Sequence, residues 1–331
     1  MSYIFIEEKN KEPKYKQIVA SIELGITNGS LKRGDKLPSI NAIREEFKVS
    51  RDTVLLGYNE LKTRGIIQSV AGKGYYIKNE NISVKQKVFL LFDEFNSFKE
   101  DLYNSFINAI DDNIMVDIFF HHFNYDVFSK LIYDNTGNYH SYIIMPANLK
   151  DTGIVVEKLP FERVCILDQI NEDLLDYKSI YQNFEQDIYT SLSKGLALLK
   201  KYQSLILFQD KKQPLGMQKG FISFCENFNF DYQILDDLKE RTPKKGEVYI
   251  IPDDKNLIRI IQKIKKSPLS LSKDIGLIAY NDNLLKEVVE GGITTITTDF
   301  IAMGTKLAEL LNSKKALKIE NTCKFIKRDS L

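Results

Sequence analysis

The chain has 331 residues, of which 43% are hydrophobic and 27% charged, with only 17 glycines and 8 prolines. This composition is typical of a globular protein of about two domains and excludes a low-complexity chain. No apolar run approaches the ~18 residues that a membrane-spanning helix needs, and the start lacks the basic and long apolar regions of a signal peptide, so we expect a cytoplasmic protein.

The formal net charge of +1 hides an asymmetry along the chain. Residues 1–79 hold 14 lysines and arginines against 9 acidic residues, a net charge of +5, whereas the remainder has a net charge of −4. A basic head on a mildly acidic body indicates a polyanionic partner for the head alone.

The basic head is predicted to contain three helices and a hairpin. Apolar residues spaced i, i+3, i+4, i+7 from Tyr15 line one face of the first helix. Ser39 is the expected N-cap of the second helix, and Ser50 that of a third helix that Gly65 ends. Two short β runs joined by a glycine-rich turn complete the head.

The rest of the chain alternates apolar runs with helical stretches after a polar linker at residues 79–86. The runs are Val88–Phe92, Met115–Phe120, Tyr142–Met145, Val164–Leu167, Ser204–Phe208, Tyr232–Leu235, Val248–Ile251, Ile275–Ala279 and Ile293–Ile296, and the stretches include 98–110, 185–201, 254–266 and 301–312. Unbroken apolar strands that alternate with helices predict parallel sheets covered on both faces. About 245 residues suit two such lobes, with ligands expected at the carboxyl ends of the strands.

The third predicted helix carries the chemistry of a nucleic-acid reader in its first turn, Ser50-Arg51-Asp52-Thr53. A helix in the major groove offers base edges its N-terminal residues. Arg51 can donate twice to a guanine edge, and Asp52 can accept from a cytosine amine. Ser50 and Thr53 can bond phosphates or bases beside the free backbone N–H groups of the helix end.

The head resembles the winged helix-turn-helix domain of the GntR family of bacterial transcription regulators. The segments that carry the resemblance are Pro13-Lys14-Tyr15-Lys16-Gln17-Ile18, Gly34-Asp35-Lys36-Leu37-Pro38-Ser39, Val49-Ser50-Arg51-Asp52-Thr53-Val54 with Tyr58–Ile67, and Gly72-Lys73-Gly74-Tyr75-Tyr76-Ile77. They cover about a fifth of the chain.

The GntR resemblance implies a set of DNA contacts. They are base or backbone contacts at Ser50, Arg51 and Thr53 and minor-groove or phosphate contacts at Gly72 and Lys73. We expect further DNA contacts at Ser39, Asn41, Arg44 and Asp52. Asn41 and Leu55 stand where the family often has basic residues, which argues against the commonest family half-site. We expect Arg44 to supply the missing backbone charge.

The body resembles the two-lobed sugar-binding domain of the LacI/GalR regulators, which is similar to periplasmic binding proteins. The resemblance rests on Phe92–Phe98, Ile278–Asp282 with Ile293–Ile296, and Gly304 with Leu307–Leu311. It implies cleft residues at Asp93, Phe98, Asp168, Met217, Asp253 and Asn281. Asn281 replaces a usual carboxylate and Met217 a common arginine, so the resemblance implies a neutral sugar or polyol as ligand.

Metal and catalytic motifs are lacking in the sequence. Cys165, Cys225 and Cys323 are too far apart for a zinc knuckle, and we expect Cys165 and Cys225 to be buried free thiols. His121 and His122 are adjacent, which is not the spacing of metal ligands. No phosphate-binding loop or nucleophile elbow occurs, so we expect no metal, no cofactor and no catalytic residue.

These observations predict a winged helix-turn-helix domain at residues 1–78, a linker at 79–86 and an α/β two-lobed, periplasmic-binding-protein-like domain at 87–331. The function expected is that of a homodimeric repressor that reads a palindromic operator and responds to a small sugar. Two alternatives remain open at this point. The body is a dimerisation scaffold without a ligand, or it is an α/β enzyme.

Overall fold

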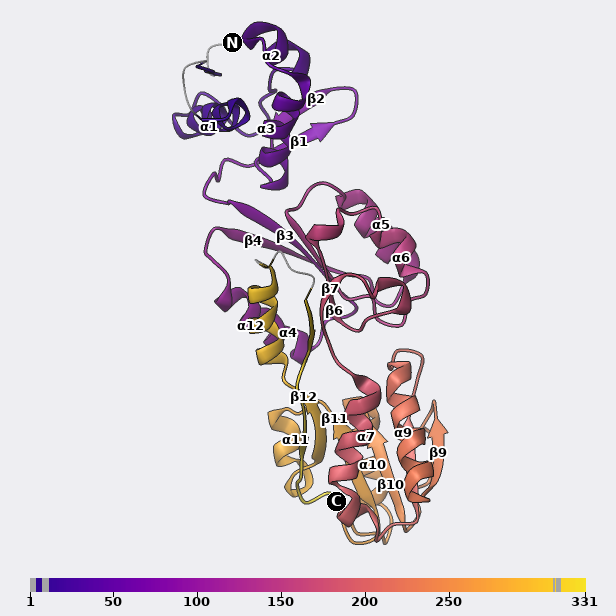
Figure 1. Cartoon of the computed structure of the whole chain (residues 1–331). Coiled ribbons are helices and arrows are strands. Elements are labelled where there is room, and N and C mark those ends of the chain that lie inside the picture. Colours follow the sequence, from indigo (N-terminus) through magenta and orange to yellow (C-terminus); the bar gives the residue numbers. More distant parts are fainter. Residues whose placement is uncertain (1–3, 8–11, 312, 314–316) are drawn as a thin grey trace.

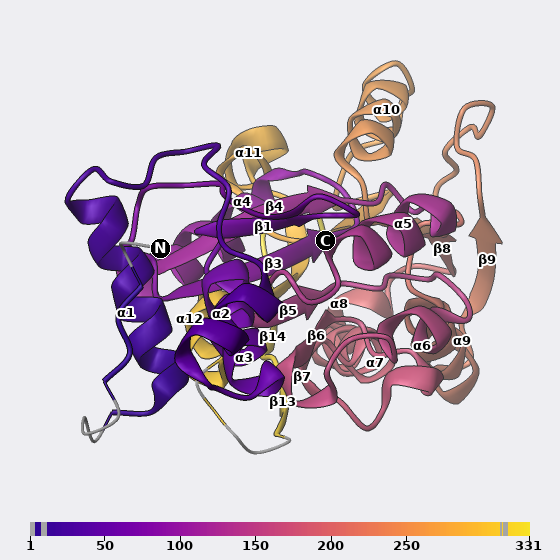
Figure 2. The same cartoon turned by 90° about the horizontal axis from the view of Figure 1, so that it is seen from above.

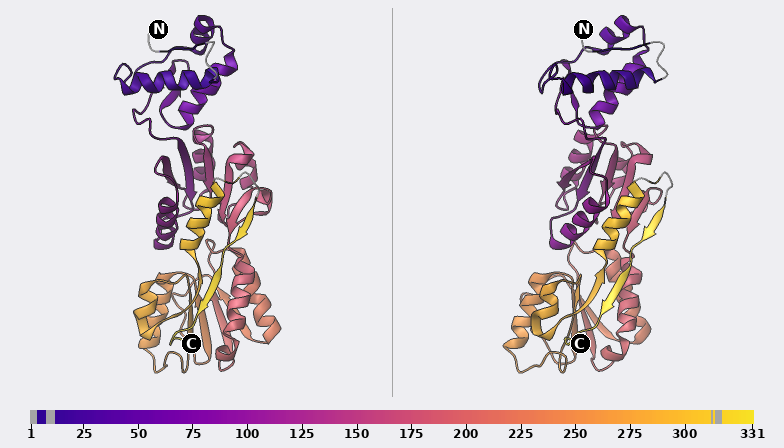
Figure 3. Two further views of the ribbon diagram at one scale, coloured as in Figure 1. Left: turned by 60° about the vertical axis from the view of Figure 1, so that its left-hand side comes forward. Right: turned by 90° about the vertical axis from the view of Figure 1, so that its left-hand side faces the viewer.

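The computed structural model describes residues 4–7, 12–311, 313 and 317–331. A small helical head and two α/β lobes follow one another along the long axis of the molecule (Figure 1). The side views in Figure 3 show the same column, with the last strands of the chain running from the upper to the lower lobe. Viewed from the head end, the helices of the head lie in front of the lobes (Figure 2).

The head consists of three helices and an antiparallel hairpin. Their bounds are α1 Lys14–Thr27, α2 Ile40–Phe47, α3 Arg51–Thr63, β1 Ile67–Val70 and β2 Gly74–Ile77. Ser39 and Ser50 cap α2 and α3 as expected, each accepting a hydrogen bond from the backbone N–H three residues further on. The inward residues of α3, Val54, Tyr58 and Leu61, are fully buried in a core that all three helices and the hairpin share.

The N-terminal lobe has a six-stranded parallel sheet with strand order β13-β7-β6-β5-β3-β4. Its strands are β3 Gln86–Phe92, β4 Ile114–Phe120, β5 Ser141–Ile144, β6 Val164–Asp168, β7 Lys178–Tyr181 and β13 Lys318–Glu320. Its helices are α4 Ser97–Ala109, α5 Tyr125–Asn135, α6 Thr152–Val156 and α12 Phe300–Leu311, with the 3-10 turns η1 Phe161–Arg163 and η2 Glu172–Leu174. Helices α4 and α12 cover one face and α5 and α6 the other, which explains the unbroken apolar strands.

The C-terminal lobe has a second six-stranded sheet with strand order β14-β12-β11-β10-β8-β9. Its strands are β8 Ser204–Phe208, β9 Asp231–Leu235, β10 Glu247–Ile251, β11 Gly276–Tyr280, β12 Thr294–Thr298 and β14 Cys323–Ile326. Its helices are α7 Phe184–Lys194, α8 Leu196–Leu199, α9 Leu215–Phe228, α10 Asp254–Lys265 and α11 Leu284–Val288, followed by η3 Val289–Gly291. Helices α7 and α9 pack on one face and α10 on the other.

Three segments of the described chain connect the lobes. They run from β7 to α7, from β12 to α12 and from β13 to β14. Gly304 lets α12 return to the N-terminal lobe, because a Cβ there would collide with Ser105 and with the carbonyl of Leu102 on α4. The three connections place the carboxyl ends of both sheets opposite each other.

All nine apolar runs are strands, but the sequence reading missed β7, β13 and β14. The last two are short and partly exposed, so they lack a strong apolar pattern. Strand β14 also runs antiparallel to β12, contrary to the expectation of purely parallel sheets. The predicted helix 185–201 is interrupted at Gly195, and Gln86, placed in the linker, begins β3. No helix within the described residues is long and apolar enough to span a bilayer.

Candidate functional site

The first turn of α3 is an open, exposed helix end. The hydroxyl of Ser50 accepts from the Thr53 N–H at 3.1 Å and lies 2.8 Å from the Thr53 hydroxyl, so both hydroxyls take part in the cap. Arg51 and Asp52 are exposed, and within the described residues Arg51 has no hydrogen-bond or ion-pair partner. The guanidinium is therefore free to approach another molecule.

The remaining candidate positions of the head lie on α2 and at the tip of the hairpin. Asn41 and Arg44 are exposed on α2, and Arg44 lies 3.7 Å from Glu45. At the hairpin tip Gly72 adopts a φ of 70°, which only glycine accepts readily, and Lys73 is exposed beside it. Both positions are open to a partner.

Lys36 is a further exposed cation that the sequence reading did not select. It forms an isolated antiparallel bridge with Tyr76, and its Cε would lie 3.5 Å from a Cβ at Gly74. The loop before Leu37 therefore adds a positive charge next to the wing. Its place in the Gly34–Ser39 segment was the signal available in the sequence.

Arg64 joins the head to the body. Its side chain is buried, pairs with Glu23 on α1, and donates to the carbonyls of Val84 at 2.8 Å and Ile82 at 3.0 Å. The segment between the hairpin and the N-terminal lobe is thus hydrogen-bonded to the end of α3 and is not a flexible linker along its whole length. A buried arginine at the end of α3 gave no recognisable signal in the sequence.

His140 of the N-terminal lobe completes this junction. Its Nε2 lies 3.3 Å from the Thr63 hydroxyl of α3, and its Nδ1 accepts from the Lys87 N–H at 3.4 Å. Burial, together with Arg163 and Arg64, lowers the pKa of His140 to about 4. The imidazole is therefore neutral at physiological pH.

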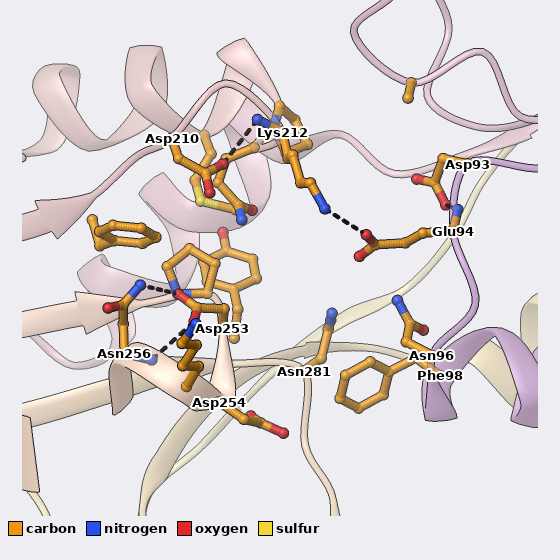
Figure 4. Close-up of a pocket in the computed structure, with 18 of the residues that line it drawn as sticks. Asp93, Glu94, Asn96, Phe98, Asp210, Lys212, Asp253, Asp254, Asn256 and Asn281 are labelled. Carbon is orange, nitrogen blue, oxygen red and sulfur yellow. Dashed lines mark hydrogen bonds and ion pairs between the residues drawn. The ribbon is translucent and has the colours of Figure 1, made fainter. Parts of the chain in front are cut away.

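A cleft of about 670 Å³ lies between the lobes, at the carboxyl ends of both sheets (Figure 4). All six positions expected from the sequence line it, namely Asp93, Phe98, Asp168, Met217, Asp253 and Asn281. The structure thus brings together residues from the ends of five strands, β3, β6, β8, β10 and β11, or from the segments that follow them. Contacts between these residues and a ligand remain a prediction.

The N-terminal wall of the cleft is built around Lys99. Its ammonium lies 2.8 Å from Asp93, and both side chains are about 10% exposed. Burial opposes the charge of Lys99, but Asp93 and Asp168 outweigh it and raise the pKa of the lysine. Burial raises the pKa of Asp168, which accepts from the Gln182 amide at 2.5 Å. Neither Lys99 nor Gln182 was selected from the sequence.

The C-terminal wall is organised by helix ends. Asp253 caps α10, and its two carboxylate oxygens accept from the backbone and side-chain nitrogens of Asn256, each at 2.9 Å. Asn281 follows β11 with a left-handed φ of 55°. Met217, on the first turn of α9, is 2% exposed and forms an apolar part of the wall. The spacing Asp253-x-x-Asn256 is a capping signal that could have identified Asn256.

Aromatic rings from both lobes also face the cleft. They are Phe98, Phe123, Phe184, Phe208, Tyr280 and Phe300. Phe98 and Phe300 are stacked, with ring centroids 5.6 Å apart and planes 25° from parallel. Such a pair offers an apolar platform next to the carboxylates.

The side chains of Lys212 and Asn148 bridge the lobes at the rim of the cleft. The ammonium of Lys212, in the loop after β8, lies 2.9 Å from Glu94 and 4.9 Å from the centre of the Phe123 ring. The Asn148 amide of the N-terminal lobe donates to the Gln213 carbonyl at 2.6 Å. These contacts hold the lobes close on one side of the cleft.

The residues considered for metal or thiol chemistry lie elsewhere. The described residues contain no cluster of three or more metal-ligand side chains. His121 is buried, its Nε2 lies 2.9 Å from the Met145 carbonyl, and burial lowers its pKa. Cys165 and Cys225 are buried as predicted, and burial raises the pKa of each thiol to about 12.

Comparison with known proteins identifies a family and relatives for the head. Residues 14–77 match the family described as bacterial regulatory proteins, gntR family. The chain is 32% identical over 106 residues to the HTH-type transcriptional repressor YtrA of Bacillus subtilis (strain 168), covering 32% of this chain and 78% of that one. It is 39% identical over 83 residues to the mannosyl-D-glycerate transport/metabolism system repressor MngR of Escherichia coli (strain K12), covering 25% of this chain and 35% of that one.

Solved structures match the body. A LacI family transcriptional regulator from Silicibacter pomeroyi has a TM-score of 0.64 at 11% identity, covering 74% of this chain and 98% of that one. A LacI family transcriptional regulator from Enterococcus faecium, solved with bound ribose, has a TM-score of 0.56 at 14% identity with the same coverage.

The two-lobed body therefore has the LacI-like, periplasmic-binding-protein-like fold, and it follows a winged helix-turn-helix head of the class found in bacterial transcription regulators. The chain belongs to the GntR family of bacterial regulatory proteins. It spans about a third of the length of MngR and most of the length of YtrA.

Proposed function

We propose that this protein is a ligand-responsive repressor that acts on DNA in the cytoplasm. In this proposal the first turn of α3 enters the major groove, Arg51 donates to a guanine edge and Lys73 of the wing contacts a phosphate. The other positions expected from the GntR resemblance, on α2, α3 and the wing, contribute backbone or base contacts. Arg51 supports this assignment, because its guanidinium is exposed at an open helix end and has no partner among the described residues.

The effector we propose is a neutral sugar or polyol bound between the lobes. Among the described residues, the cleft is lined by eight carboxylates and five cationic side chains, so an anionic ligand would meet net repulsion. Each engaged carboxylate retains lone pairs that accept ligand hydroxyls. The stacked rings of Phe98 and Phe300 offer a surface for the apolar face of a sugar ring.

One observation carries the proposal. A ligand-sized cleft lies between the lobes and includes the carboxyl end of β3. Arg64, at the end of α3, binds the segment that leads into the other end of β3. A ligand that prefers one arrangement of the lobes can therefore bias how the head is held. The named repressors among the relatives favour repression that the effector relieves.

We also propose a homodimer, because a palindromic operator requires two heads related by a two-fold axis. Helix α11 carries the exposed apolar residues Leu284 and Val288, at 82% and 77% exposure, and we place the contact there. The double variant Leu284→Glu/Val288→Glu should sediment as a monomer, whereas Leu215→Glu, at an exposed leucine on α9, should leave the dimer intact. A dimeric double variant contradicts this placement.

The decisive experiment is a thermal-shift screen with neutral pentoses, hexoses, polyols and their phosphates. A neutral sugar should raise the melting temperature at saturation and release the protein from operator DNA in fluorescence anisotropy. A complete panel without any shift favours a scaffold body. Chemical conversion of the bound sugar, detected by mass spectrometry, favours an enzyme.

A further inference from the structure

A buried lysine lies beneath the cleft on α11. Lys286 is 2% exposed, although lysine side chains are seldom fully buried unless they are paired. Its neighbours on the same short helix, Leu284 and Val288, are the most exposed apolar residues of the described chain. The lysine therefore points inward from a helix whose other side faces solvent.

All three N–H groups of the Lys286 ammonium have acceptors. They are a carboxylate oxygen of Asp254 at 2.8 Å, the Tyr280 carbonyl at 2.9 Å and the Asn281 carbonyl at 2.7 Å. The Lys286 carbonyl also accepts from the Ile293 N–H at 2.7 Å. One residue thus ties together the start of α10, the end of β11 and the start of β12.

Lys286 fixes the backbone of Asn281, a cleft residue. Asn281 has a left-handed φ of 55°, which costs free energy for a residue with a Cβ unless the surroundings hold it. Its carbonyl is held by Lys286, and its N–H donates to the Ile296 carbonyl at 2.8 Å. Because its backbone N–H and carbonyl are both held, Asn281 keeps its place in the wall of the cleft.

The same ammonium faces the opposite lobe. Its nitrogen lies 5.3 Å from the centre of the Phe98 ring on α4, within the range of a cation–π interaction. Phe98 in turn stacks on Phe300. Lys286 thus contacts both Asn281 and Phe98, which line the cleft from different lobes and are labelled in Figure 4.

We propose that Lys286 is a positioning residue for the effector, holding Asn281 and Phe98 in the arrangement that the closed cleft requires. This inference rests on the proposed function, because it assigns a role in effector binding. If Lys286 stabilised only the C-terminal lobe, its removal would lower that lobe's stability without changing the surroundings of Phe98.

The chain lacks tryptophan, so Phe98→Trp places a single fluorescent reporter beside Lys286. In this background Lys286→Met should raise the Stern–Volmer constant for acrylamide quenching at least twofold, because the indole loses its contact with the opposite lobe. Lys286→Arg should restore most of the protection, since a guanidinium keeps the charge over the ring. Lys219→Met, at an exposed lysine on α9, should change nothing.

Circular dichroism and thermal melting confirm that each variant is folded before quenching is compared. A folded Lys286→Met variant whose quenching equals that of the parent overturns the proposal. If that variant does not fold, Lys286→Arg and Lys286→Gln provide the comparison, and equal quenching in both overturns it as well.

A second measurement separates this proposal from the proposed function. D-ribose and the other sugars of the panel are titrated by calorimetry into the protein with Phe98 in place, with and without Lys286→Met. Where one of these sugars binds the unsubstituted protein, Lys286→Met should weaken its binding at least tenfold, and unchanged affinity overturns the role of Lys286 in positioning. Where neither ribose nor any other sugar of the panel binds, the proposed function fails, and the quenching comparison still decides whether Lys286 holds the lobes together.

Discussion

The head and the cleft present their candidate contact residues in opposite ways. In the head, Arg51 and Lys73 are exposed, and within the described chain Arg51 has no partner to give up. In the cleft, Asp93 and Lys99 are buried and bound to each other. A partner of the head meets side chains that are free, whereas a ligand of the cleft must insert into contacts that already exist.

This difference distinguishes residues that should affect only binding affinity from residues that should also affect folding stability. Substitutions of Arg51 or Lys73 should change binding and leave folding almost untouched, because within the described chain neither side chain has a partner. Substitutions of Asp93, Lys99 or Asp253 in the cleft should alter both quantities, because each of these side chains also binds a neighbour. Variants in the two regions test this contrast.

Lys99→Met should destabilise the body by about 3–5 kcal/mol, because it leaves Asp93 and Asp168 buried without their shared cation. Urea denaturation followed by circular dichroism measures the loss. The matched control is Lys212→Met, which removes the exposed rim pair with Glu94 and should cost no more than about 1 kcal/mol. Equal midpoints for the two variants would show that the buried charges are not a stabilising unit.

Arg51→Ala should weaken operator binding by about 1–3 kcal/mol and relax the sequence preference at one base pair. Its melting temperature should equal that of the parent, since the side chain contacts no partner in the part of the chain that the structure describes. Competition anisotropy against random duplexes gives both quantities. Lys266→Ala, at an exposed position at the end of α10, is the control, and operator binding by Arg51→Ala at the parent level would refute the reading-helix assignment.

The junction between head and body should respond to acid. The pKa of His140 in the folded protein, about 4, lies below the ordinary value of 6.5, so between these pH values the unfolded chain binds a proton that the folded chain does not. Stability should therefore fall as pH decreases from about 6.5 to about 4, by at most about 1 kcal/mol per pH unit for this half-buried ring. His140→Gln should flatten the dependence, and an unchanged slope would exclude His140 as its source.

Lys73→Ala should have the smallest effect on recognition. Losing one phosphate contact lowers the slope of log K against log salt by about 0.9 and weakens binding to all duplexes alike. Titrations at four or more salt concentrations measure the slope. A change in sequence preference, rather than in slope, would assign Lys73 to base reading.

The head could be predicted from the sequence almost completely. Its elements depend on local signals, namely the caps at Ser39 and Ser50 and the stop at Gly65, and the structure places all three as expected. The central strands of the body were equally clear, because burial on both faces makes them continuously apolar. Strands β13 and β14 were not predictable, since their short, half-exposed sequences become strands only by pairing with distant edges.

The cleft was only partly predictable for a related reason. Asp93, Asp168 and Asn281 were identified through the resemblance to the LacI/GalR domain, and each lies at or just after a strand end, where folds of this kind bind ligands. Lys99 and Lys286 were missed, because a lysine is normally solvated and only tertiary packing buries these two. Buried charged residues that hold other side chains in place are thus harder to identify from the sequence than residues that line the site.

The fastening of Arg64 to the segment before β3 has a consequence for operator architecture. In the proposed dimer, a head that is bound to the segment before its lobe could not turn to reach a half-site that is rotated around the duplex. One base pair inserted at the operator centre rotates a half-site by about 35°, so binding should depend sharply on the helical phase of the two half-sites.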